Sequence, residues 1–165
     1  MIHSDYVMRM VTMLATFLAR VLLQKQRGTL PLALTEIDQA GRTLIGMDRG
    51  MMRLFGAEQL MALFGKDLTV ALPKAYVLGV LMAEEAGILD LQGETAEAAA
   101  VRMKALHLLL ATYVAGEGPV DEMHDQRIDR CVEDLGDAPR TPAVQELLER
   151  RDVMPGHGRQ EPAGT

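Results

Sequence analysis

The chain has 165 residues, of which 48% are hydrophobic, 24% charged and 4% aromatic, and its formal net charge is -6. This apolar fraction is large enough to bury the core of one domain, so it excludes a chain that is disordered throughout. The single Cys excludes an internal disulfide framework, and the acidic balance argues against a nucleic-acid-binding surface. We therefore expect one globular domain over residues 1–152, and composition alone names no substrate or reaction.

The most apolar stretch, residues 5–27, predicts an amphipathic helix that begins at the capping residue Ser4 and ends at Gly28. Its polar residues recur every three or four positions, which is typical of one solvated stripe. The uncharged run between Arg9 and Arg20 is about half as long as a membrane-spanning helix requires. An arginine inside the apolar stretch also argues against a secretory signal. We expect a packed helix in a cytoplasmic protein with no membrane partner.

Helical patterns continue along the chain, and Gly and Pro separate them. A second helix is predicted from Pro31 to Ile45, because proline is favoured at the first position of a helix. Residues 48–65 predict an insert of two short helical pieces, the first of them capped by Asp48. A long helix is predicted from Pro73 to about residue 91. No stretch of strict alternation is long enough to predict a strand.

The remainder of the chain predicts one more long helix over 94–115 and acidic C-terminal helices over 121–151, the first of which is capped by Asp121. Residues 117–152 hold 11 acidic and 5 basic side chains, which accounts for the whole net charge. This stretch is interpreted either as a solvated helix surface or as a docking face for a basic partner. The tail over 153–165 is dense in Gly and Pro, so we expect it to be disordered.

Two segments repeat one pattern at a spacing of 65 residues, in which a Gly is followed five and twelve positions later by Ala. The glycine would reverse the chain between two antiparallel helices, and the alanines would let those helices approach closely. We expect hairpins near 5–45 and 73–115 that share this packing. The residues of the pattern are Gly28, Ala33 and Ala40 in the first copy and Gly93, Ala98 and Ala105 in the second.

The stretch QGETAEAAAVRMKALHL, residues 92–108, resembles the middle of a tetratricopeptide repeat, and residues 27–40 resemble the same region more faintly. Residues 5–115 also resemble an uncharacterised bacterial family of small, all-helical, tetratricopeptide-repeat-like proteins of unknown function. The helical patterns along the chain predict an all-α fold, a helical hairpin array of about six to eight helices, and the resemblance supports this fold. It implies no catalytic residue.

Two sets of side chains are candidates for chemistry. The first set would be a metal site on the acidic helices, and the second would be a carboxylate site in the core of the helical bundle. A competing interpretation makes one of the glutamates a structural ion pair with Arg102 or Lys104. No phosphate loop, serine nucleophile elbow or paired cysteine is present, and we expect no cofactor. The candidates are Asp121, His124 and Cys131 in the first set and Glu84, Glu85 and His107 in the second.

The predicted function is that of a non-catalytic scaffold or adaptor for protein–protein interaction that forms a homodimer. The broad apolar face of the first helix supports this prediction, because a chain of this size has little interior to cover it. The alternative is a metal-binding or enzymatic helical bundle. The residues assigned to the interaction face are Val7, Met10, Val11, Leu14, Leu18 and Val21.

Overall fold

The computed structural model describes residues 5–156, and within this range the chain forms eight α-helices and no strand. The all-α class predicted from the sequence is confirmed. The predicted cap Ser4 and positions 157–165 of the predicted tail lie outside the described residues. The helices are α1 (Asp5–Gln26), α2 (Leu30–Ile45), α3 (Arg49–Leu54), α4 (Ala57–Leu63), α5 (Leu68–Leu91), α6 (Thr95–Ala115), α7 (His124–Leu135) and α8 (Pro142–Asp152).

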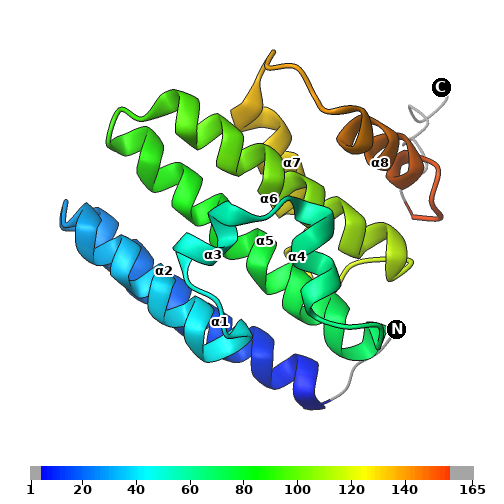
Figure 1. Cartoon of the computed structure of the whole chain (residues 1–165), viewed down its shortest axis with the longest axis horizontal. Helices are drawn as coiled ribbons and strands as arrows, with labels where there is room; N and C mark the ends of the chain where they lie inside the picture. The colour runs from blue at the N-terminus through cyan, green and yellow to red at the C-terminus, as the bar shows by residue number, and fades with distance from the viewer. Residues whose placement is uncertain (1–4, 157–165) are drawn as a thin grey trace, which may run out of the picture.

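Four long helices lie side by side in the order α1, α2, α5 and α6 (Figure 1). Helices α1 and α5 run in one direction, and α2 and α6 run in the opposite direction. Helices α7 and α8 pack against α6, while α4 packs against both α5 and α6 and α3 packs against α2. The core therefore lies along α5, which has neighbours on several sides and is buried over most of its length.

The two hairpins, α1–α2 and α5–α6, have the same turn geometry. Each turn contains a glycine in the left-handed region, Gly28 with φ 73° and Gly93 with φ 81°. The amide of Thr29 donates to the carbonyl of Gln24 at 3.0 Å, and 65 residues later the amide of Glu94 donates to that of Leu89 at 2.9 Å. Glycine adopts this conformation at no steric cost, so each of these residues ends one helix and allows the next to fold back on it.

The alanines of the repeated pattern lie in the core. Their methyl groups are fully buried, at Ala33, Ala40, Ala98 and Ala105. At Gly79 of α5 an added Cβ would lie 3.0 Å from the side chain of Leu109 on α6. The paired helices therefore approach closely because small residues occupy their contact positions. A tetratricopeptide arrangement of these hairpins stays a prediction.

The predicted start of the second hairpin was wrong by one and a half turns. Helix α5 begins at Leu68, and Pro73 lies inside it. The carboxylate of Asp67 accepts a hydrogen bond from the amide of Thr69 at 3.1 Å, so the helix has an N-terminal cap well before the proline. A proline this close to the start of a helix removes only one intrahelical hydrogen bond, which the capping and the apolar packing of the first turns offset.

The start of α7 also differs from the prediction, because this helix begins at His124 and not after Asp121. The carboxylate of Asp121 accepts hydrogen bonds from the amide of Met123 at 2.9 Å and from the hydroxyl of Tyr76 at 2.6 Å. Asp121 therefore holds a turn that precedes the helix and ties this turn to α5. The cap predicted at Asp48 does accept an amide hydrogen bond, from Met51, and Thr141 caps α8 in the same way by accepting from the amide of Val144.

Candidate functional site

Glu84 and Glu85 are adjacent in α5, but they point to different parts of the molecule. The side chain of Glu85 is fully buried, and its Oε1 accepts a hydrogen bond from Nη2 of Arg53 at 2.8 Å. This hydrogen bond raises the pKa of Arg53 above its ordinary value. Arg49 lies 3.9 Å from the same oxygen, whereas Glu84 lies 3.9 Å from Nζ of Lys25 on α1. A structural ion pair is present at Glu85, but α3 supplies its partners.

The partners expected from α6 make other contacts. Arg102 donates to Asp90 at 2.7 Å, so it closes the α5–α6 hairpin near its turn. Lys104 donates to the carbonyl of Met52 at 3.1 Å, and burial lowers its pKa. The sequence offered no signal for the Glu85–Arg53 pair, because the insert that carries Arg53 could lie on any side of the hairpins.

His107 is half-buried, and burial lowers its pKa below the ordinary value. Over residues 5–156, no three His, Cys, Asp or Glu side chains converge in a way that could hold a metal ion. The arrangement therefore does not bring Glu84, Glu85 and His107 together as a carboxylate–histidine centre.

His124 is fully buried and is hydrogen-bonded through both ring nitrogens. Its Nδ1 accepts from the amide of Val120 at 3.0 Å, which makes Nε2 the donor to the carbonyl of Leu109 at 2.8 Å. The ring also lies against Tyr76, with centroids 4.5 Å apart, and Tyr113, at 5.1 Å. Burial lowers the pKa of His124 to about 4. This histidine is a neutral, fully engaged core residue that ties the α6–α7 connection to α5 and α6.

Cys131 lies about one turn before the end of α7 and is also buried. Burial raises the pKa of its thiol to about 12, so the thiolate needed for metal binding or nucleophilic attack is scarce at neutral pH. The carboxylate of Asp121 is hydrogen-bonded to the hydroxyl of Tyr76. The side chains of Asp121, His124 and Cys131 therefore serve the packing of α7 on the rest of the molecule.

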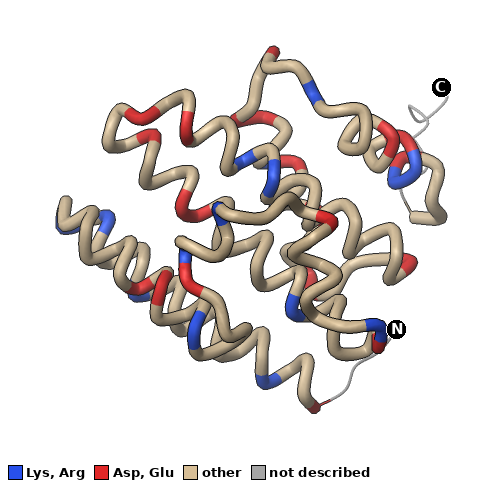
Figure 2. Tube along the Cα trace, viewed as in Figure 1, with Lys and Arg blue, Asp and Glu red and all other residues tan. Residues whose placement is uncertain are grey.

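The acidic helices carry their own counter-charges. Arg151 of α8 is buried between Asp125, at 2.8 Å, and Asp129, at 3.1 Å, and these contacts join α8 to α7. Asp134 lies 3.6 Å from Arg130. Figure 2 shows acidic and basic positions next to each other on α8. The negative charge is therefore partly used to hold the C-terminal helices together.

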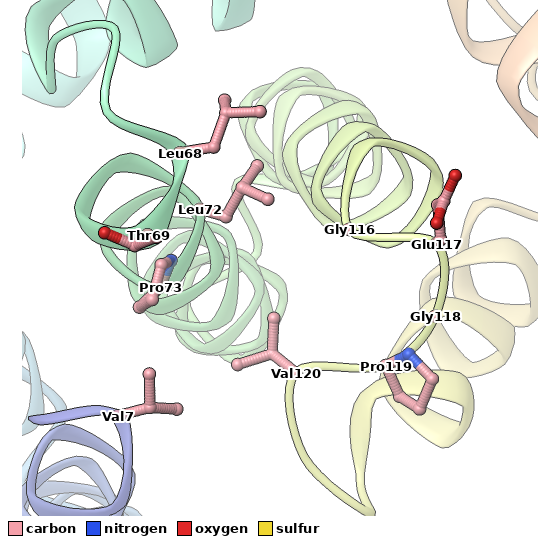
Figure 3. Close-up of a pocket in the computed structure, with 10 residues that line it drawn as sticks. All are labelled: Val7, Leu68, Thr69, Leu72, Pro73, Gly116, Glu117, Gly118, Pro119 and Val120. Atoms are coloured by element: carbon pink, nitrogen blue, oxygen red, sulfur yellow. The ribbon is translucent and has the colours of Figure 1, made fainter. Parts of the chain in front are cut away.

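A cleft of about 240 Å³ lies where the start of α1, the start of α5 and the loop after α6 meet. Figure 3 shows the residues that line it, most of which have apolar side chains or none. Val7, Leu72 and Val120 point toward its interior. The polar side chains that line it are those of Thr69 and Glu117, and the Thr69 hydroxyl donates to Asp67. Catalysis needs several polar groups aimed at one point, and this cleft does not supply them.

The residues assigned to the interaction face of α1 lie inside the molecule, so that assignment is corrected. Val7, Met10, Leu14 and Val21 are buried, and Val11 and Leu18 are partly buried. Helices α2 and α5 pack against α1, and this packing covers the apolar side that the sequence pattern singled out. A single chain therefore buries these residues without a partner.

A different face of α1 is exposed. We name as the α1 outer face the six residues on its opposite side, which form a stripe with larger side chains at each end and small ones between. These residues are Met8, Thr12, Ala15, Thr16, Ala19 and Leu23. Met8 is 59% exposed and Leu23 is 42% exposed. A shallow hollow in the surface follows the central part of this face.

The hydroxyls of the two threonines of the α1 outer face are hydrogen-bonded to the helix backbone. The hydroxyl of Thr12 donates to the carbonyl of Met8 at 2.8 Å, and the hydroxyl of Thr16 donates to that of Thr12 at 3.3 Å. Both hydroxyls are thus used within the helix. A partner that covers this face would have no unpaired side-chain hydroxyl to desolvate.

The repeated pattern relates each residue of the α1 outer face to the residue 65 positions later, in α5. The face of α5 that these matching residues form is covered by other helices. All of the matching residues except Glu84 are buried; they are Pro73, Val77, Val80, Leu81, Glu84 and Ile88. A helix turns by about 100° per residue, so Val77 and Leu81 lie on the side of α5 opposite Gly79 and α6. Helices α1 and α2 pack against α5 there (Figure 1). The same kind of face is therefore covered on α5 and exposed on α1.

Helices α1 and α6 are each long and apolar enough to cross a membrane by length and composition, a criterion that core helices of soluble proteins also meet. No family model, curated protein or solved structure matches the chain. The resemblance to the bacterial helical family stays a prediction.

Proposed function

We propose that this protein is a non-catalytic helical adaptor that associates with protein, and first of all with a second copy of itself, through the α1 outer face. One observation carries the proposal: the matching face of α5 is buried under the α1–α2 hairpin, whereas no element within the described residues 5–156 covers the α1 outer face. Apolar helix faces of this kind are buried where a neighbour is available, because burial removes apolar surface from water.

The chemistry of the face supports a protein partner. None of its six residues is charged, although Arg20 also borders the hollow along it. Its hydroxyls are used within the helix, and its small residues allow another helix to approach closely. Arg9 and Arg20 flank it with exposed guanidinium groups, which stay in water at the rim of a contact. These properties suit a packed helix contact.

The test is sedimentation velocity of the full chain between 5 and about 200 µM. We expect the mass to rise from that of the 18.1 kDa monomer toward twice this value with increasing concentration. Thr16→Arg places a charge in the α1 outer face, so we expect it to weaken self-association at least tenfold, since an unpaired charge in an apolar contact is costly.

The matched control is Thr35→Arg on α2. Thr35 is also exposed, and its hydroxyl also donates to the carbonyl four residues earlier, that of Pro31. This variant should associate like the wild type. A wild type that stays at 18.1 kDa over the whole range, or a Thr16→Arg variant that associates normally, overturns the proposal.

A further inference from the structure

The covered face of α5 shows which kind of neighbour fits the exposed face of α1. Helix α2 lies beside α5 on the side away from α6, and the two helices run in opposite directions (Figure 1). By the 65-residue correspondence, the element that fits the α1 outer face is another helix running antiparallel to α1. Antiparallel neighbours also place opposite ends of their helix dipoles together.

The α1 outer face of a second copy is itself an exposed helix face with small residues at its centre. On the basis of the proposed function, we infer that two copies pair α1 against α1 antiparallel about a two-fold axis between Ala15 and Thr16. The axis places Met8 of one copy opposite Leu23 of the other, Thr12 opposite Ala19, and Ala15 opposite Thr16.

The side-chain sizes agree with this pairing. The small residues Thr12, Ala15, Thr16 and Ala19 meet at the centre, where the helices cross most closely, and Met8 and Leu23 close the two ends. In a two-fold contact one surface must fit itself, so each pair occurs twice. The α1 outer face meets this requirement, because it has one large side chain at each end and four small residues between them, in whichever direction the helix runs.

The length of α1 sets the strength of the contact. Its 22 residues give a helix about 33 Å long. A single helix face of this length is smaller than the about 800 Å² per partner of a standard stable interface. The dimer is therefore reversible and forms at micromolar concentration, which sets the range of the experiments.

Cysteine cross-linking tests the orientation, because a disulfide requires two Cα atoms within about 7 Å. Met8→Cys and Leu23→Cys proteins are oxidised with diamide at about 200 µM, each alone and as a mixture in which one carries a mass tag. In the antiparallel pair two copies of position 8 lie about 22 Å apart along the axis. We expect the tagged–untagged cross-link in the mixture and none beyond background in either protein alone. Wild type provides the background, since its single Cys131 is buried.

The outcomes separate this inference from the proposed function. Cross-linking of Met8→Cys and Leu23→Cys each with itself indicates parallel helices, and it overturns the inference while the sedimentation result stands. A wild type that dimerises with no cross-link in any sample also overturns it. A wild type that stays monomeric, or that binds phosphatidylcholine–phosphatidylglycerol vesicles through α1 in place of a second copy, overturns both.

Discussion

His124 is neutral at physiological pH because the core around it excludes water and its ring is fully hydrogen-bonded in the neutral form. A charged imidazolium could not accept the hydrogen bond from the Val120 amide. The cost of charging this ring appears as a pKa of about 4 in the folded protein, compared with about 6.5 in an unfolded chain.

This difference predicts a loss of stability in mild acid. Between pH 6.5 and about 4 the unfolded state binds a proton at His124 that the folded state does not, so the free energy of unfolding falls as pH falls. The loss amounts to about 3 kcal/mol and is complete near pH 4. Urea unfolding of wild type and His124→Gln from pH 4 to 7.5 measures it, because the other titrating groups are common to both. A difference between the two proteins that is independent of pH would contradict the assignment.

The Glu85–Arg53 pair is asymmetric, since Glu85 is fully buried and Arg53 is 41% exposed. Arg53→Ala strands a buried carboxylate with Arg49 at 3.9 Å, so we expect it to cost about 3 kcal/mol. Glu85→Gln keeps the shape, removes the charge and leaves Arg53 in contact with water, so we expect about 1 kcal/mol. Urea unfolding at pH 7 ranks the two variants, and the reverse order would contradict this account.

At the scale of the elements, the α2–α3 connection folds back onto Gly41 of α2. An added Cβ at Gly41 would lie 2.1 Å from the carbonyl oxygen of Met47 and 2.8 Å from the end of the Met52 side chain. Only glycine allows the connection to lie this close to α2. This close contact positions α3 so that Arg53 can bind Glu85. The position of the insert thus depends on one missing side chain.

Alanine substitutions at two helical glycines should therefore have opposite signs. Gly41→Ala must move backbone, so we expect it to lower the free energy of unfolding by about 2–3 kcal/mol. An added Cβ at Gly87 in α5 would lie 3.8 Å from Nζ of Lys25 and close to no other group. Gly87→Ala should therefore raise the free energy of unfolding by about 0.5–1 kcal/mol, because alanine has the higher helix propensity. Denaturant unfolding of both variants checks the signs. A neutral Gly41→Ala would show that the connection does not rest on this glycine.

At the scale of the whole molecule, the α1 outer face stays exposed among residues 5–156, whereas the matching face of α5 is covered by the first hairpin. Self-association would couple dimerisation to folding, because a partner that binds only the folded state stabilises it by mass action. The thermal midpoint should therefore rise with protein concentration between 5 and 200 µM. In Thr16→Arg it should not depend on concentration, and calorimetry of the two proteins compares them. A midpoint independent of concentration in both would contradict self-association.

Local patterns predicted most of the helices. Gly28, Gly46 and Gly93 end or reverse helices where the sequence places them, because glycine alone reaches positive φ without strain. The start of α5 was mispredicted because proline was taken as a first helical residue, although Asp67 provides the earlier cap.

The candidate site was harder to predict than the fold. Hydrophobic periodicity located the apolar side of α1 at Val7, Met10 and Leu14, but not which element would cover it, and α2 and α5 cover it within the chain. The 65-residue spacing was the available signal, since it relates Thr12 and Thr16 to the buried Val77 and Leu81.

The helical class and the two glycine turns could be predicted from the sequence, because helix propensity and capping depend on neighbours along the chain. Tertiary structure alone decided that Arg53 is the partner of Glu85, that His124 is a neutral core residue, and that the exposed side of α1 is the one opposite α2. Those outcomes depend on which elements meet in space, and an apolar helix side has the same pattern whether a neighbour covers it or water does.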